Sequence, residues 1–582
     1  MPITCLLCSA PIEITPTDLA FYEKVSPVFN GKKELITPPT LCPDCRNRRR
    51  MAWRNDRTFY SRTCDLTKEK FISIYPADAP FPVYKPSAWY GDGWDPLKYG
   101  MDLDLTRPFF EQFAELQKKV PRLGIDIVNC QNSEYCNYCG DDKNCYLDIA
   151  GEANEDCFFN LFIKYCKDCT DCTFCYHSTL CYESLNCEKC YNVRYSSYLD
   201  DCSDCTLCFD MRGCRNCALS INLRNKEYHI LNQPHTKKEY EKKMKELNMG
   251  SAASREKVFA LWQKMRISKG IYRDMYNVSC ENCVGNDIRN SKNCERVFNA
   301  VNCEDCKYLN DVLDAKDCQD LNYSLYKPEA SYELISTLAM RFSAWCVASH
   351  YCATSFYCDM VNNSSDLFGC IGLNHKKHCF LNKQYTKEEY DALVPKIIDQ
   401  MRKNGSGPAM NQSPSSGSWP AMNPSAGDAS GSWGEFFPAS ISSFAYNETV
   451  AQEYYPLSKD QATGLGFRWM DRAKTEPKPA TAAVADHIRD VPESIVKETL
   501  ACATCKKNYR LTAQELKFYR QSEVPVPRKC PDCRHSARLA LRNPRKLWSR
   551  ACAKCQKPIA TSFAPERPEF LYCEQCYLKE VY

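Results

Sequence analysis

The sequence is short of histidine and of long apolar runs, and both absences exclude classes of protein. Only 8 of its 582 residues are His, and none is spaced to serve as a metal ligand beside a cysteine. No Gly-rich phosphate loop, His-Glu-x-x-His or Gly-x-Ser-x-Gly motif occurs. No apolar segment approaches the roughly 20 residues that a membrane-spanning helix needs. We therefore expect neither an enzyme active site nor a membrane segment.

Charge of one sign is lacking too. The 76 Lys and Arg against 72 Asp and Glu give a net charge of +4, which excludes a uniformly basic nucleic-acid coat. A hydrophobic content of 44% is sufficient for packed cores, and the length predicts several domains. The first residues, from Met1 to Cys5, contain neither a basic nor an apolar signal-peptide region. We expect a soluble, cytoplasmic protein with reduced thiols.

Cysteine is the residue that the sequence has in excess. Its 41 cysteines fall into four groups: 5 between Cys5 and Cys64, 17 between Cys130 and Cys217, 11 between Cys280 and Cys379, and 8 between Cys502 and Cys576. A long chain without an export signal is not expected to hold them in disulfides. They are therefore expected to be metal ligands, catalytic groups or small buried side chains.

The two ends of the chain carry C-x2-C pairs, each of which offers two thiolates from one tight turn. Zinc takes four thiolates in structural sites, so two pairs complete one tetrahedral site. The spacing predicts about three zinc ions, held by Cys5, Cys8, Cys42 and Cys45, by Cys502, Cys505, Cys530 and Cys533, and by Cys552, Cys555, Cys573 and Cys576.

A fourth site is predicted to be lost. After its second cysteine pair, the N-terminal module aligns without a gap with the C-terminal one, so that Cys64 matches Cys552. Beyond that point Thr67, Lys85 and Ala88 stand where the other three ligands should be. Cys64 is therefore interpreted as the relic of a former site.

Arginines recur at helical spacing after each second cysteine pair. Arg46, Arg50, Arg54 and Arg57 align with Arg534, Arg538, Arg542 and Arg545. Such a stripe beside aromatic residues suits contacts with phosphates and bases. The alternative is a helix face that is solvated or salt-bridged to acidic neighbours within the protein. Because the stripe occurs in both copies although their inserts differ, we favour nucleic-acid binding.

The middle of the chain has a period of three. All 17 cysteines from Cys130 to Cys217 occupy one frame of three, with larger steps of 12 and 15. This period matches neither a helix nor a plain strand. It predicts a narrow β-solenoid with coils of 12 or 15 residues, whose interior is filled by every third side chain. Asp or Asn precedes many of these cysteines and suits tight corners that can bridge successive coils.

A second repeat region follows with shifts of frame. Residues 223–240 match residues 373–390 at a constant offset of 150. Polar helices near 237–248 and 387–403 are expected to cap the two solenoids. Amphipathic helices at 108–120 and 254–269 are expected to flank the first solenoid. The interior thiols are interpreted mainly as packing, with metal storage or redox chemistry as the alternative.

These elements predict a mainly β fold: two narrow cysteine-lined β-solenoids (β-helices) with capping helices, flanked by N- and C-terminal zinc ribbons. The expected domains are a zinc-ribbon module at 1–100, solenoids at 101–250 and 251–402, a flexible linker at 403–433, an aromatic docking segment and linker at 434–495, and a double zinc ribbon at 496–582.

Both ends carry C-x2-C, a Phe-Tyr pair and then Pro-x-x-Cys-Pro-Asp-Cys-Arg, with Phe21-Tyr22 and Phe518-Tyr519 as the aromatic pairs. This pattern resembles the "probable zinc-ribbon" domain of bacterial proteins. The whole arrangement resembles uncharacterised cysteine-rich repeat proteins of small-genome candidate-phylum bacteria. The resemblance implies zinc at the matching cysteines and brings no established activity.

We expect a non-enzymatic zinc-binding scaffold whose Arg-striped ribbons bind RNA, DNA or a ribonucleoprotein. Two alternatives stay open. The solenoid cysteines could serve thiol-based metal storage or redox chemistry, or the protein could be an assembly module for other proteins.

Overall fold

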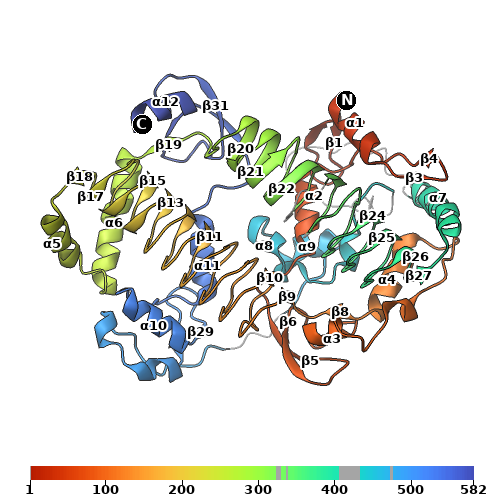
Figure 1. Cartoon of the computed structure of the whole chain (residues 1–582), viewed down its shortest axis with the longest axis horizontal. Helices are drawn as coiled ribbons and strands as arrows, with labels where there is room; N and C mark the ends of the chain where they lie inside the picture. The colour runs from red at the N-terminus through yellow and green to blue at the C-terminus, as the bar shows by residue number, and fades with distance from the viewer. Residues whose placement is uncertain (1, 323–328, 336–337, 405–432, 472–475) are drawn as a thin grey trace. The chain divides into compact units, whose positions relative to one another are not determined.

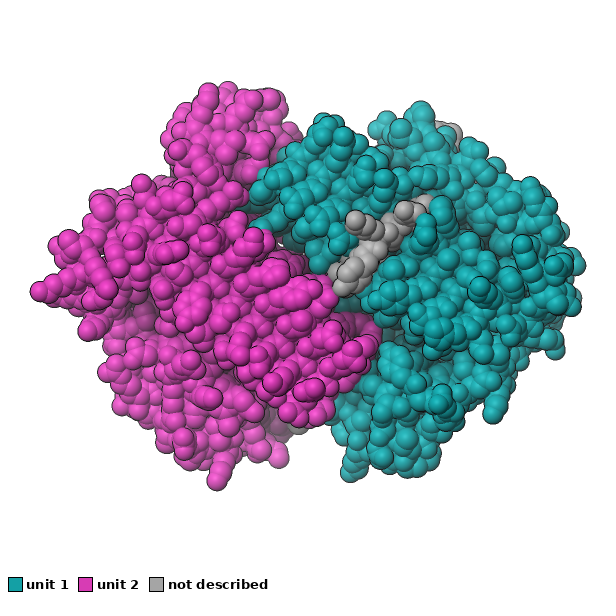
Figure 2. Space-filling model, in the orientation of Figure 1, with its two compact units in different colours: residues 1–125, 275–471, 545–547 teal, residues 126–274, 472–544, 548–582 magenta. Residues whose placement is uncertain are grey.

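The computed structural model describes residues 2–322, 329–335, 338–404, 433–471 and 476–582. The chain divides into two compact units, and each unit is discontinuous in sequence (Figure 2). The first contains residues 1–125, 275–471 and 545–547, and the second contains residues 126–274, 472–544 and 548–582. The N-terminal module thus folds with the second repeat region, and the C-terminal module folds with the first.

In the second unit, residues 127–230 form a parallel stack of short strands, called here the first stack (Figure 1). Thr173 pairs with Leu185 and Ser203 with Arg215, and all parallel pairings described in this stack have the same offset of twelve residues. The expected coil of 15 residues is therefore wrong here, because that step is one coil plus one three-residue side. The strands are β9 (Ile127–Val128), β10 (Cys139–Gly140), β11 (Thr173–Tyr176), β12 (Leu185–Glu188), β13 (Ser197–Asp200), β14 (Ser203–Thr206), β15 (Phe209–Arg212), β16 (Arg215–Ala218) and β17 (Glu227–Ile230).

The corners of the stack are made by residues in the left-handed region. Asn144, Asp156 and Asp168 have φ of 54°, 55° and 50°, and each precedes an inward-facing residue. Asn and Asp adopt this region at least cost among the residues with a side chain. The amide of Asn132 donates to Asn144 Oδ1 at 3.0 Å, and that of Asn144 donates to Asp156 Oδ1 at 3.2 Å. The predicted coil-to-coil bridges are therefore present.

Cysteine side chains fill the interior of the first stack. They form one buried cluster together with Ile163, Val193 and Leu199. Every cysteine of the chain is free of disulfides. The Cys166 thiol, for example, lies 3.4 Å from the carbonyl oxygens of Lys164 and Cys175, and it can donate to either. Hydrogen-bonded thiols at these places act as small packing groups.

In the first unit, residues 278–380 form a second parallel stack. Its offset is eleven residues at Glu281–Lys292, twelve after a bulge at Val284/Gly285, and thirteen at Lys316–Glu329. These irregular coils account for the shifts of frame in the sequence. The strands are β20 (Glu281–Arg289), β21 (Lys292–Glu304), β22 (Asn310–Gln319), β23 (Glu329–Tyr332), β24 (Ala353–Phe356), β25 (Ser365–Phe368) and β26 (Lys377–Phe380).

Each stack ends in the same way. A short antiparallel strand, β18 (Gln233–Pro234) or β27 (Lys383–Gln384), turns back on the last coil and leads into helix α5 (Lys237–Leu247) or α7 (Lys387–Asn404). Thr236 and Glu239 form a capping box at the start of α5. The two helices thus lie where the duplicated segment predicted them.

The terminal modules are built from hairpins and short helices. The first unit has β1 (Pro2–Thr4), β2 (Pro11–Glu13), β3 (Val28–Phe29), β4 (Lys32–Lys33), β5 (Tyr60–Thr63), β6 (Lys70–Ser73), β7 (Val83–Tyr84) and β8 (Arg122–Leu123), with helices α1 (Pro16–Val25), α2 (Pro43–Met51), α3 (Pro86–Trp89), α4 (Phe109–Lys119), α8 (Val450–Tyr454) and α9 (Lys459–Gly464). The second unit has β19 (Ile271–Arg273), β28 (Leu500–Ala501), β29 (Asn508–Tyr509), β30 (Trp548–Ala551), β31 (Pro558–Thr561) and β32 (Phe570–Tyr572), with helices α6 (Ala252–Lys269), α10 (Ala513–Gln521), α11 (Pro531–Ala540) and α12 (Glu574–Val581).

The expectation of a mainly β fold holds only in part. About 25% of the residues are helical and 29% are in strands, mostly in short parallel sheets, and none of the described sheets closes on itself. Helix α4 does not flank the first stack as expected, because Phe109 packs on Phe368 of the second stack with ring centroids 5.3 Å apart. None of the described helices is long and apolar enough to cross a membrane.

The aromatic segment that begins at Trp433 packs within the first unit. Trp433, Phe436 and Phe437 are buried in one cluster with Tyr357 of the second stack and Trp53 of the N-terminal module. This segment therefore joins stack and ribbon within the first unit. Most of the linker predicted at 403–433 lies outside the described residues.

Candidate metal centres and the arginine helices

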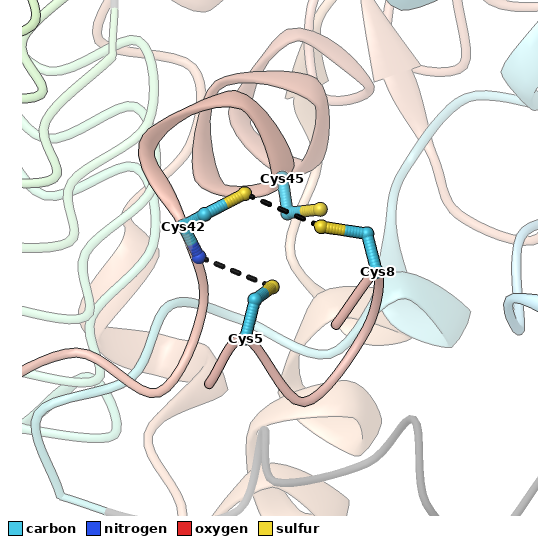
Figure 3. Close-up of side chains that lie close together, drawn as sticks. All are labelled: Cys5, Cys8, Cys42 and Cys45. Carbon is cyan, nitrogen blue, oxygen red and sulfur yellow. Dashed lines mark hydrogen bonds between the residues drawn. The ribbon is translucent and has the colours of Figure 1, made fainter. Parts of the chain in front are cut away.

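Three sets of four cysteines come together in the described part of the chain. In each set the four Sγ atoms lie within 4.8 Å of one another. Figure 3 shows the N-terminal set: Cys5 and Cys8 come from the β1–β2 turn, whereas Cys42 and Cys45 lie at the start of α2. The other sets are Cys502, Cys505, Cys530 and Cys533, and Cys552, Cys555, Cys573 and Cys576. These are the twelve cysteines that the spacing selects as metal ligands.

The three sets share one local geometry. The first cysteine of the helical pair donates its N–H to the first thiol of the hairpin pair: Cys42 to Cys5 and Cys530 to Cys502 at 3.2 Å, and Cys573 to Cys552 at 3.3 Å. The hairpin closes through a left-handed residue, Ser9, Lys506 or Gln556, with φ between 58° and 64°.

This arrangement favours the thiolate form of the first hairpin cysteine. Burial raises the pKa of Cys552, but backbone N–H groups of Cys555, Cys573 and Lys554 outweigh it and lower the pKa to about 6. The pKa of Cys502 is lowered to about 6 in the same way. All three helical cysteine pairs also begin a helix, where the macrodipole favours negative charge. Four such sulfurs at these separations form a donor set for one tetrahedral divalent ion.

The relic around Cys64 keeps the backbone geometry without the ligands. The Lys85 N–H donates to Cys64 Sγ at 3.4 Å, and Lys68 has the left-handed φ of 62°. In place of further thiols, Cys64 lies in an apolar cluster with Tyr84, Trp89 and Leu123. No metal-binding set includes Cys64 among the residues that the structure describes.

The arginines of α2 point into the first unit. Arg46 is 1% exposed and is paired with Asp320 through its Nε. Arg50 is fully buried, and its Nε donates to Asn322 Oδ1 at 2.7 Å. Arg49, which the stripe did not include, pairs with Glu333 at 2.9 Å.

The arginines of α11 repeat this arrangement in the second unit. Arg534 Nε lies 2.9 Å from Asp171 Oδ2, and Arg538 Nη1 lies 2.5 Å from Asp171 Oδ1. Arg538 also donates to the Phe159 carbonyl at 2.9 Å. Both arginines are 4% exposed, so one buried aspartate of the first stack binds two arginines of the ribbon.

These contacts correct the interpretation of the stripe. Arg46, Arg50, Arg54, Arg534 and Arg538 are buried and paired inside the protein, as the salt-bridge alternative described. Arg57 and Arg542 are half-buried, and the half-buried Arg545 is paired with Asp311. The stripe marks the side of each ribbon that docks on a stack.

The acidic partners of these arginines were not predicted from the sequence. Asp171, Asp320 and Glu333 have φ of 55°, 62° and 45°, so all three are corner residues of the stacks. The sequence marked Asp171 as a corner residue only. The only signal for these partners in the sequence is the three-residue frame. It places them at corners of the stacks, where a side chain points away from the interior.

A pocket of about 190 Å³ lies in the first unit beside the start of α2. Arg296, Arg545 and Lys546 line it together with Asp44, and the aromatic rings of Phe298, Tyr308 and Tyr455 form part of its wall. Arg296 and Lys546 are exposed. The pocket therefore combines positive charge with aromatic surface.

No protein-family profile matches the chain, and no curated protein matches it either. The function is therefore inferred from the residues and their geometry.

Proposed function

We propose that the protein is a non-enzymatic scaffold in which zinc-bound ribbons lock two narrow β-solenoids. The observation that carries the proposal is that both arginine helices start at a cysteine set and bury their guanidinium groups on acidic corners of a stack. We also propose that the whole chain belongs to the bacterial zinc-ribbon repeat proteins that its sequence resembles.

Zinc is the ion that this donor set suits best. Four thiolates in a tetrahedral arrangement select zinc or an iron centre. Structural zinc sites of this kind leave no coordination position open for a water molecule or a substrate. In each set the second hairpin cysteine (Cys8, Cys505 and Cys555) is exposed, so the site can be loaded from solution without opening the stack.

The ion would fix where the arginines lie. Cys42 is the N-cap of α2 and Cys530 the N-cap of α11, so a metal at either set holds the first turn of the helix. Arg46 and Arg534 each follow one residue after the last ligand. A metal-anchored helix start therefore presents the guanidinium groups to Asp320 and Asp171 with little loss of conformational entropy.

Hydrogen exchange on the full chain tests this coupling. Removal of the metal with a chelator, verified by elemental analysis, should strip exchange protection from α2 and α11. Helices α5 and α7 serve as the internal control and should stay protected, because they pack on the stacks without a metal ligand. Unchanged protection at α2 and α11 after metal loss would contradict the proposal.

A second candidate, nucleic-acid binding, is supported by the pocket beside α2. Arg296 and Lys546 could contact phosphates while Tyr308 or Tyr455 stacks on a base. The surface differs from the stripe that the sequence suggested.

Salt-dependent binding of labelled RNA and DNA tests it. The R296E/K546E variant should reduce the slope of log K against log salt by about 1 to 2. The K242E/K243E variant on α5 carries the same change in charge and should bind like the parent. Equal binding by all three proteins, or none, rules this candidate out.

The thiols in the interior of the second stack support metal storage less well. The Cys358 and Cys370 thiols are fully buried, and burial raises the pKa of both well above the usual range. Hydrogen bonds from such thiols to carbonyl oxygens keep the proton on sulfur, as in Cys358 to Phe356 at 3.4 Å. An assembly role for other proteins is compatible with the scaffold and would appear as partners that co-purify after nuclease treatment.

A further inference from the structure

The first two coils of the first stack have an interior unlike the rest. The inward frame, which elsewhere carries mostly Cys, Ser and aliphatic residues and the two amides Asn154 and Asn160, carries two carboxylates here, Asp142 and Asp148. Asp142 is 1% exposed and Asp148 is fully buried. We define the interior cluster as Cys136, Cys139, Asp142, Cys145 and Asp148.

The side chains of this cluster converge. The ligand atoms of Cys136, Cys139 and Asp142 lie within 4.8 Å of one another, and so do those of Asp142, Cys145 and Asp148. Asp142 belongs to both groups. Asp142 thus adjoins two thiols in one group, and one thiol and a second carboxylate in the other.

Neither carboxylate is satisfied by the protein. Asp142 Oδ1 accepts from the Asn154 N–H at 2.9 Å, and Asp148 Oδ2 accepts from the Asn154 amide at 3.0 Å. The other oxygens, Asp142 Oδ2 and Asp148 Oδ1, are buried without a hydrogen-bond partner. No Lys or Arg of the described residues forms an ion pair with either. A buried anion without a cation is costly, so this place calls for a positive ion or for protons.

Gly151 leaves the space for these groups. A Cβ on Gly151 would lie 2.8 Å from Asp142 Oδ2, from Asp148 Oδ2 and from Asn154 Nδ2. Its inward neighbours one coil before and one coil after are Cys139 and Ile163. The absent side chain is thus replaced by two carboxylates that bend into the same gap.

We propose that the interior cluster binds one divalent transition-metal ion, most suitably zinc, through Asp142 and the surrounding thiolates and Asp148. Zinc takes thiolate and carboxylate ligands together, whereas calcium and magnesium require oxygen ligands. The thiols release their protons to solvent when the ion binds. The cluster is then a fourth metal site in addition to the three cysteine sets.

Protonation is the alternative. Burial raises the pKa of Asp142 to about 6 and that of Asp148 well above its usual range. Two neutral carboxylic acids could therefore occupy the interior without a metal. A metal count distinguishes the two cases, because the protonated form binds none.

The test is the number of metal ions per full-length chain after saturation with zinc and removal of loosely bound ion, measured by native mass spectrometry and elemental analysis. The parent should hold four ions. The D142N/D148N variant should hold three, because the amides keep the shape and lack the charge. As a matched control, C169S/C181S changes two fully buried interior cysteines of the first stack and should keep all four metal ions.

Three ions in the parent, or the same count in D142N/D148N as in the parent, would overturn the site. A C552S/C573S variant separates this result from the proposed function, since it should lose one ion whether or not the interior cluster binds. If D142N/D148N does not fold, cobalt substitution of the parent decides. Four cobalt ions with a mixed thiolate–carboxylate component in the absorption spectrum support the site, and three ions with a pure tetrathiolate spectrum reject it.

Discussion

Two corresponding segments, each a hairpin followed by a helix start, surround Cys64 and Cys552. They share a backbone geometry and differ in the contacts that their side chains make. We call them the N-terminal half and the C-terminal half. Both hairpins close through a left-handed residue, Lys68 or Gln556, and in both a helix-capping N–H points at the first sulfur. Around Cys552 the remaining contacts are three further thiols. Around Cys64 they are aromatic and aliphatic side chains, among them Trp89, which is 7% exposed.

We infer from this difference that such a half can be completed either by a metal ion or by an apolar cluster. In the C-terminal half two of the four cysteines, Cys555 and Cys576, remain accessible to solvent, whereas Cys64 of the N-terminal half is buried. The N-terminal half instead packs Phe71 and Trp94 around the former site. Burial of these rings stabilises this half without a set of metal ligands.

The largest expected effect is the loss of a complete metal site. C552S/C573S should lose one metal ion and exchange protection throughout β30, β31 and α12, because structural zinc contributes about 10–16 kcal/mol in zinc-finger peptides. C64S should lose no metal and should cost only about 1–3 kcal/mol for placing a hydroxyl in an apolar cluster. Elemental analysis and hydrogen exchange measure both.

If C64S also released an ion, the relic would be a functioning site and the contrast between the two halves would disappear. The opposite result, an unchanged metal count in C552S/C573S, would remove the third cysteine set from the metal sites.

The next effect concerns what the two ribbons share. R50M leaves Asp320 and Glu333 without one of their buried cations, and R538M does the same to Asp171. Each should lower the free energy of unfolding of its own unit by about 3–5 kcal/mol, as is usual when one partner of a buried ion pair is removed.

Thermal or denaturant unfolding of the full chain, followed separately for each unit by hydrogen exchange, measures this loss. The controls are R48M on the half-exposed side of α2 and R528M, whose pair with Asp486 is at the surface; both should stay within about 1 kcal/mol of the parent. A loss for R50M no larger than for R48M would mean that docking does not depend on the stripe.

Local features could be predicted from the sequence, and long-range partners could not. The cysteine sets, the frame of three and the capping helices follow from spacings within one or two elements. Arg50 lies 272 residues from its partner Asn322, and no local pattern links them. Likewise, Asp142 and Asp148 stand in the inward frame, but the expectation of small or apolar interior residues passed over them. The expected place of helix α4 was wrong because an amphipathic pattern does not indicate which surface the helix covers.

The smallest change in stability is expected from rebuilding the lost site. T67C/K85C/A88C adds three thiols at the positions that align with Cys555, Cys573 and Cys576. Lys85 already caps α3 and already directs its N–H at Cys64, so the backbone needs little rearrangement. We expect one additional metal ion and a change in unfolding free energy much smaller than that of C552S/C573S, because the apolar cluster stabilises this half before the metal binds.

Cobalt titration of the rebuilt protein gives the decisive comparison. One additional tetrathiolate cobalt centre, absent from the T67C/A88C double variant, would show that the backbone of the relic still fits a metal. If the triple variant binds no more cobalt than the parent, packing around Trp89 has displaced the hairpin from the helix start. The two halves would then differ in backbone as well as in ligands.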